Sequence, residues 1–288
     1  MGLSYFLESI YLNDRLDITE GASHQLRVAV RLLNRFAGPV ALNGLSKALL
    51  VDWMRALGEG RSAATVNGRR SSVLSIWNYA AELAYCDLPP RIPKRREPQR
   101  LPVVWTIEQV GQILGACAQV PGVWLGVPVS LAWRLAVLVC WDTACRIGSL
   151  LAAKVQDVDL CAGTWQVPAE SMKGRRADRL YRLHPDTIDT ISRTLPSART
   201  RLFPYPFAPR QVFSSYARLL RLAGLPADRQ HLFHCLRRSS ESYAAQARGI
   251  EFAAAAVGHG VDVARRSYVS PVLCPGPSLI DAIPRPTF

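Results

Sequence analysis

The segment from Leu88 to Pro102, LPPRIPKRREPQRLP, constrains the fold more than any other part of the sequence. It contains five prolines, and proline ends helices because it lacks a backbone N–H and its ring clashes with the preceding turn. The 288-residue chain is therefore expected to form two domains, at 1–88 and 103–270, joined by an extended basic linker at 89–102. Residues 271–288 hold five more prolines and are expected to form an extended C-terminal tail.

The first domain is expected to be entirely helical. Apolar residues recur at helical spacing over residues 20–38, which end at Gly38, and arginines repeat every four residues on another face. Further helices are expected at 45–57 and from Ser62, which is a good N-cap, to Tyr85. Arg69 and Arg70 fall largely off the apolar side of the last helix.

The second domain is expected to be mainly helical with a small β-hairpin. Thr106 and Gln109 form a capping box at the start of one helix, and residues 131–141 form a buried helix. Two strand-like segments, 163–169 and 178–184, flank the turn SMKGRRA, which contains Lys173. The remaining helices are expected at 209–222, 233–248 and 252–257. The fold class is thus mainly α with a small sheet.

The net charge of +13 and the sequence pI of about 9.9 indicate an anionic partner such as nucleic acid. The excess of basic residues runs through both domains. The most apolar stretch, Val120–Trp141, is interrupted by two prolines and Arg134, so no membrane span is expected. Seven cysteines without a CxxC pair or metal-ligand spacing favour a cytoplasmic protein without a metal site.

Several short strings carry residues suited to phosphate chemistry. Arg146, in TACRIGSLL, follows a buried helix at the start of the next, where a guanidinium can bind a phosphate. His234 and Arg237, in HCLRR, share a helix face. His259 and Tyr268 follow in GHGVDVARRSY, and a tyrosine becomes nucleophilic when a base or cation favours its phenolate. Each string alone is more often structural than functional.

Taken in order, these strings resemble the tyrosine recombinase, or phage integrase, family along nearly the whole chain. The resemblance implies a helical core-binding domain and a catalytic domain that together clamp DNA. Six positions match the family's catalytic residues: Arg146, Lys173, His234, Arg237, His259 and Tyr268. Arg69 and Arg70 are the candidates for further DNA contact.

The resemblance implies strand cleavage and rejoining through a 3′-phosphotyrosine bond, without metal, ATP or other cofactor. Tyr268 is then the nucleophile, Arg146 and Arg237 bind the phosphate, and Lys173 protonates the leaving 5′-hydroxyl. His234 handles the proton of the tyrosine, and His259 hydrogen-bonds or orients the phosphate. The implied partners are double-stranded DNA with an inverted-repeat site, three further copies in a tetramer that exchange their C-terminal tails, and an accessory or directionality protein.

Three features depart from the family pattern. Ala144 stands where a glycine is usual, Ser149 stands where an acidic residue is usual, and the hairpin around Lys173 is about one residue longer. Two alternatives therefore stay open. One is a type IB topoisomerase-like enzyme that nicks and reseals DNA as a monomer, and the other is a DNA-binding architectural protein without catalysis.

Overall fold

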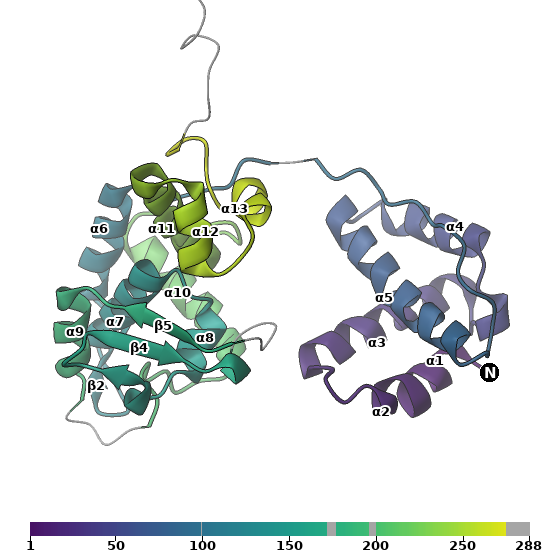
Figure 1. Cartoon of the computed structure of the whole chain (residues 1–288), viewed down its shortest axis with the longest axis horizontal. Coiled ribbons are helices and arrows are strands. Elements are labelled where there is room, and N and C mark those ends of the chain that lie inside the picture. Colours follow the sequence, from purple (N-terminus) through teal and green to yellow (C-terminus); the bar gives the residue numbers. More distant parts are fainter. Residues whose placement is uncertain (99, 172–176, 196–199, 275–288) are drawn as a thin grey trace, which may run out of the picture. The chain divides into compact units, whose positions relative to one another are not determined.

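The computed structural model describes residues 1–98, 100–171, 177–195 and 200–274. The chain forms two compact units, Met1–Gln99 and Arg100–Phe288 (Figure 1). Each unit has a hydrophobic core of its own. Among the described residues, no helix combines the length and the apolar character that crossing a bilayer requires.

The first unit consists of helices. Its N-terminal helix is continuous over three segments, with a π-helical turn in the middle, and α3 packs against both α4 and α5. The elements are α1 (Leu3–Phe6), η1 (Leu7–Tyr11), α2 (Leu12–Asp14), α3 (Glu20–Ala37), η2 (Leu42–Gly44), α4 (Lys47–Leu57) and α5 (Ala63–Glu82).

Side-chain caps explain where the three long helices of this unit begin. Thr19, Ser46 and Ser62 each accept a hydrogen bond from the backbone N–H three residues later. Gly38 ends α3 with a φ of +77°, a conformation that glycine adopts without steric cost. The helices expected from the sequence are therefore confirmed, while the N-terminal helix lies in a region for which no helix was expected.

Part of the segment expected to be a linker lies against the first unit. Ile92 is only 2% exposed and belongs to the core of this unit. The side chain of Asn67, on α5, accepts a hydrogen bond from Arg95 N at 2.9 Å and donates one to Arg95 O at 2.8 Å. Arg70 donates to Ile92 O, and Arg69 donates to the backbone and side-chain oxygens of Gln25. Both arginines expected to contact DNA are thus engaged within their own unit.

The second unit is mainly helical, and α7 packs against α6, α8, α9 and α11. Its helices are α6 (Ile107–Cys117), α7 (Val129–Thr143), α8 (Ile147–Ala152), α9 (Pro185–Ser192), α10 (Val212–Leu222), α11 (Phe233–Arg248), α12 (Ile250–Val257) and α13 (Val261–Ser267), with 3₁₀ turns η3 (Val155–Asp157), η4 (Ala169–Ser171) and η5 (Pro209–Gln211). The capping box expected at Thr106 and Gln109 is confirmed. The helices α9 and α13 lie where the sequence analysis expected none.

The second unit also contains a three-stranded antiparallel sheet, part of which is seen between α9 and α8 in Figure 1. Its strands are β3 (Val158–Asp159), β4 (Thr164–Val167) and β5 (Arg179–Arg182), and Trp165 pairs with both Val158 and Tyr181. A separate hairpin joins β1 (Val123–Trp124) to β2 (Val127–Pro128). The expected β4–β5 hairpin is confirmed. Lys173, which comes between these strands in the sequence, falls outside the described residues.

An aromatic cluster fixes the start of α11. Phe233 stacks on Tyr216 of α10, with ring centres 4.0 Å apart, and lies parallel to Trp133 of α7 at 6.4 Å. Because these rings are buried, the first turns of α11 lie firmly against α7. This packing brings the residues after Phe233 close to the C-terminal end of α7.

Candidate active site

The turn between α7 and α8 places Arg146 at a helix start. Thr143 ends α7, and its hydroxyl donates to Val139 O and accepts from Cys145 N. Ala144 adopts a left-handed conformation with φ +46° and ψ +30°. That conformation costs an alanine about 1–2 kcal/mol, which is why glycine is favoured at such a position. The turn ends at Arg146, the N-cap of α8.

Arg237 is the central cation of the site. It lies on α11, is only 2% exposed, and donates a hydrogen bond from Nη1 to the carbonyl oxygen of Ala144. Its Nε and Nη2 atoms have no hydrogen-bond partner among the described residues. Burial, and to a smaller extent the charge of Arg146, lower its pKa, but a guanidinium keeps its charge in proteins. Two buried donors are thus available to a ligand.

A cavity of about 910 Å³ is lined by chain neighbours of Arg237 and Ala144, namely His234 and Arg238 on α11 and Cys145 and Arg146 on the turn before α8. His234 and four arginines line the cavity together with apolar side chains, and the arginines are Arg146, Arg210, Arg229 and Arg238. No acidic residue is among the described lining residues. Such a lining attracts an anion. Partial desolvation, followed by the charges of three nearby arginines, lowers the pKa of His234 to about 4. His234 is therefore neutral near pH 7 and able to accept a proton.

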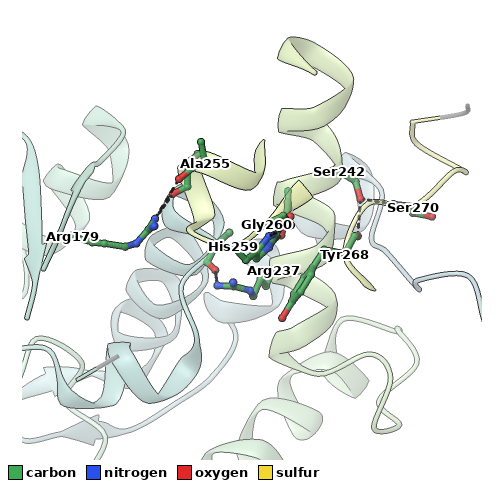
Figure 2. A network of polar contacts seen from close by, with 11 residues as sticks. Arg179, Arg237, Ser242, Ala255, His259, Gly260, Tyr268 and Ser270 are labelled. Atoms are coloured by element: carbon green, nitrogen blue, oxygen red, sulfur yellow. Dashed lines mark hydrogen bonds and ion pairs between the residues drawn. The ribbon is translucent and has the colours of Figure 1, made fainter. Parts of the chain in front are cut away.

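Tyr268 follows α13 and lies beside these groups (Figure 2). Tyr268 is 8% exposed, and the guanidinium carbon of Arg237 lies 5.0 Å from the centre of the tyrosine ring. The ring centre of His234 is 5.8 Å away. The buried hydroxyl of Ser242, on α11, donates to Tyr268 O at 3.2 Å and accepts from Ser270 N at 2.9 Å. Ser242 thereby fixes the backbone on both sides of Val269.

His259 lies between α12 and α13 and stacks on Tyr268. The two ring centres are 4.8 Å apart, and the ring planes meet at 22°. Its Nε2 atom lies 2.9 Å from Oε1 of Glu241, and its Nδ1 atom lies 3.3 Å from Gly260 O. Both ring nitrogens are therefore turned towards acceptors of the protein itself.

Arg179 connects the β4–β5 hairpin with the segment that holds His259 (Figure 2). It lies on β5 and donates from Nη1 to Ala256 O at 3.1 Å and to Ala255 O at 3.4 Å. These carbonyls belong to the last turn of α12. The guanidinium also occupies the space that a Cβ atom would fill at Gly258, whose φ is +83°. The hairpin strand is thus anchored to carbonyls three and four residues before His259.

The structure brings together five of the six residues that the resemblance identified: Arg146, His234, Arg237, His259 and Tyr268. The sixth, Lys173, lies outside the described residues. Three further residues of the site were missed, namely Glu241, Ser242 and Arg179. The helical spacing of four between Arg237 and Glu241 was the one signal in the sequence for Glu241.

No group of three or more histidine, cysteine, aspartate or glutamate side chains in the described part of the chain is arranged to hold a metal ion. The cluster around Arg237 is suited instead to an anion, because it presents unpaired N–H donors and a surplus of positive charge.

No protein-family model matches this sequence, and neither does any curated protein sequence. Solved structures do match. A lambda integrase dimer bound to a COC′ core site is 18% identical with a TM-score of 0.69, and the match covers 90% of this chain and 92% of that one. The Tn1549 transposon integrase in complex with transposon right-end DNA is 15% identical with a TM-score of 0.69, over 92% and 93% of the two chains.

A third match is the XerH site-specific recombinase in a post-cleavage complex with a palindromic difH substrate. It is 17% identical with a TM-score of 0.68, over 84% of this chain and 74% of that chain. The matches extend over most of this chain and most of each of the other chains. The chain therefore has the tyrosine recombinase fold.

Proposed function

We propose that this protein is a site-specific DNA recombinase that breaks and rejoins strands through a phosphotyrosine intermediate. The observation that carries the proposal is Arg237, a buried guanidinium with two unpaired N–H donors beside the ring of Tyr268. Leaving such donors buried and unpaired costs free energy, which a bound phosphate recovers by accepting both. A phosphate held there lies next to a phenol.

The proposed reaction begins when the phenol oxygen of Tyr268 attacks the scissile phosphorus. A bond forms between this oxygen and phosphorus, while the bond from phosphorus to the 5′-oxygen breaks. Arg146 and Arg237 neutralise the non-bridging oxygens as their negative charge grows. The phenol proton passes to His234, whose neutral ring accepts it, and a bound phosphate offsets the positive charge that lowers the pKa of His234.

The departing 5′-oxygen must receive a proton, and Lys173 is the proposed donor. The anchoring of β5 by Arg179 supports this role, because it ties the base of the hairpin to the segment that precedes His259. The phosphodiester energy is retained in the phosphotyrosine bond, so a second 5′-hydroxyl rejoins the strand by reversing these steps. The proposed reaction uses no metal or nucleotide cofactor.

Exchange between two duplexes needs four strand cleavages, so we propose a homotetramer on DNA. The dimeric state of the lambda integrase bound to its core site and the palindromic substrate of XerH support an oligomer on an inverted-repeat site. The net charge of +13 supports a large number of phosphate contacts. A protein with six to ten such contacts loses about 10³- to 10⁵-fold in affinity between 50 and 200 mM salt.

The test is to incubate the protein with fragmented genomic DNA of its source organism and to denature the mixture. Strands that stay covalently attached are then recovered and sequenced. Adducts that concentrate at one inverted-repeat site are the expected result, and Tyr268→Phe is expected to yield none. Scattered adducts indicate the topoisomerase-like alternative. Intact DNA binding without any adduct indicates a DNA-binding protein without catalysis and contradicts the proposal.

A further inference from the structure

Glu241 is a buried carboxylate that the proposed reaction does not use. Its exposure is 0%, and Arg237 is the one other charged side chain that is buried to a similar degree in the described part of the chain. Both lie on α11, four residues apart, and therefore on one face of the helix. Burying a carboxylate is costly unless it is paired, so an apolar residue of similar size is the cheaper occupant of such a position.

The partner of Glu241 is His259. Oε1 lies 2.9 Å and Oε2 lies 3.2 Å from the Nε2 atom of the imidazole. Burial raises the pKa of Glu241, while the neighbouring His259 and Arg237 counteract this rise. The carboxylate is thus held between two basic side chains that both contact the ring of Tyr268.

This pairing fixes the orientation of the imidazole. Nε2 faces Glu241 at 2.9 Å and Nδ1 lies 3.3 Å from Gly260 O. Because a neutral imidazole carries one N–H, the shorter contact with Glu241 is the one that holds the ring. Its face is then left to stack on Tyr268, and the side chain of His259 is only 10% exposed. A hydrogen bond from His259 to a phosphate, as the family resemblance implies, requires one of these two contacts to break.

We infer that Glu241 is a positioning residue, which holds the ring of His259 face to face with Tyr268 and so keeps the phenol beside Arg237. This inference rests on the proposed function, because it assigns the stacked histidine the task of orienting the nucleophile. Glu241 acts only through His259 and touches no reacting atom.

A matched pair of variants isolates the hydrogen bond. Glu241→Gln and Glu241→Met have similar volume and no charge, but only glutamine keeps an oxygen within reach of His259 Nε2. The assay is single-turnover adduct formation at saturating DNA, with the DNA dissociation constant measured separately. We expect Glu241→Met to be about 10- to 100-fold slower, the usual effect of removing the partner that orients a functional histidine. We expect Glu241→Gln to stay within about 5-fold of wild type.

The dissociation constant for DNA is expected to stay within about 2-fold for both variants, since Glu241 is fully buried and is not among the described residues that line the cavity. Glu251→Gln, on the exposed first turn of α12, is the control and is expected to react like wild type. Equal rates for Glu241→Met and wild type overturn the inference. Equal slowing of the methionine and glutamine variants also overturns it, because the hydrogen bond is then not what matters.

A second pair of variants covers the case in which a single substitution unfolds the protein. His259→Phe keeps a ring to stack on Tyr268, and Glu241→Met combined with His259→Phe replaces the whole buried pair by apolar groups, which is often neutral for stability. If Glu241 acts through His259, the double variant is as fast as His259→Phe. A double variant that is several-fold slower shows that Glu241 acts by another route and contradicts the inference.

A measurement without DNA separates this inference from the proposed function. In NMR spectra of the free protein, ring protons of His259 and Tyr268 are expected to show mutual nuclear Overhauser effects in wild type and Glu241→Gln. The effects are expected to weaken strongly in Glu241→Met. If wild type forms no adducts, only the proposed function is refuted. If the nuclear Overhauser effects between His259 and Tyr268 are unchanged in Glu241→Met, the role of Glu241 is refuted.

Discussion

Replacing Arg237 by methionine is expected to stabilise the DNA-free protein while it abolishes strand cleavage. Each of the two unpaired buried N–H groups costs about 1–3 kcal/mol of folding free energy. Methionine removes this cost but also loses the charge-assisted hydrogen bond to Ala144 O, which contributes about 1.5–3 kcal/mol. These ranges place the change in unfolding free energy between a loss of about 1 and a gain of about 4.5 kcal/mol, with the middle at a gain of about 2 kcal/mol. The loss of the positive charge that stabilises buried Glu241 reduces this gain.

Urea unfolding of wild type and Arg237→Met measures this difference, and heating gives a second reading. In a domain of this size about 1 kcal/mol corresponds to about 2–4 °C in midpoint temperature, so a rise of several degrees is expected. Adduct formation by the same variant is expected to fall at least about 10³-fold, because two phosphate contacts disappear from the transition state. Arg265→Met, an exposed arginine on α13, is the control for the loss of one positive charge.

The reasoning is refuted if Arg237→Met loses more than about 2 kcal/mol of unfolding free energy, well outside the expected gain. That result means that the guanidinium is fully satisfied in the free protein and holds the fold together. If Arg237→Met is stable and still forms adducts, the second part of the prediction, that Arg237 binds the phosphate, is refuted.

Three further outcomes follow from single side chains. Because the pKa of His234 is about 4, the second-order rate of adduct formation is expected to stay level down to about pH 5. A half-maximal rate near the usual histidine pKa of about 6.5 contradicts the lowered pKa of His234. Since folding favours the neutral form of His234, the stability that this residue contributes is complete above about pH 6.5 and declines as the pH falls towards 4. Ser242→Ala leaves Tyr268 O and Ser270 N unpaired, so urea unfolding should show a loss of about 1–3 kcal/mol in the free energy of unfolding. Gel assays should show slower adduct formation at unchanged DNA affinity, and an unchanged rate contradicts the proposal that Ser242 fixes the backbone at Tyr268. Gly258→Ala is expected to lose at least about 1–2 kcal/mol, because its φ is positive and because the new methyl group displaces the guanidinium of Arg179. Gly260→Ala, with φ −71° and open space at Cβ, is expected to lose less, about 0.5–1 kcal/mol, because alanine is a poorer N-cap than glycine. Equal effects of the two substitutions contradict the argument.

Much of the fold follows from local sequence signals. Ser62 and Thr106 begin helices where their capping hydroxyls predict it, and Gly38 ends one. The hairpin strands were predicted from two strand-like segments, 163–169 and 178–184, on either side of a turn, and β4 and β5 lie within them. The helix α13 was missed because its segment, VDVARRS, has few apolar residues and gains its stability from packing on α12.

The site shows where sequence reasoning ends. Arg237 and Tyr268 could be predicted because their order along the chain matches a known pattern. Glu241 could not, since a glutamate four residues after an arginine ordinarily indicates a solvated ion pair on a helix surface. Its burial depends on tertiary contacts, among them the packing of α12 on α11 and the approach of His259. Arg69 and Arg70 stay predictions as DNA contacts, although both are engaged by neighbouring backbone or side-chain oxygens.

The identity of the residue that becomes attached to DNA tests the central claim most directly. Trapped adducts are digested with trypsin and nuclease, and the nucleotide-bearing peptide is identified by mass spectrometry. The account predicts a nucleotide joined through its 3′-phosphate to Tyr268, and no such peptide from Tyr268→Phe. A nucleotide on any other residue, or a 5′-phosphate linkage, contradicts it.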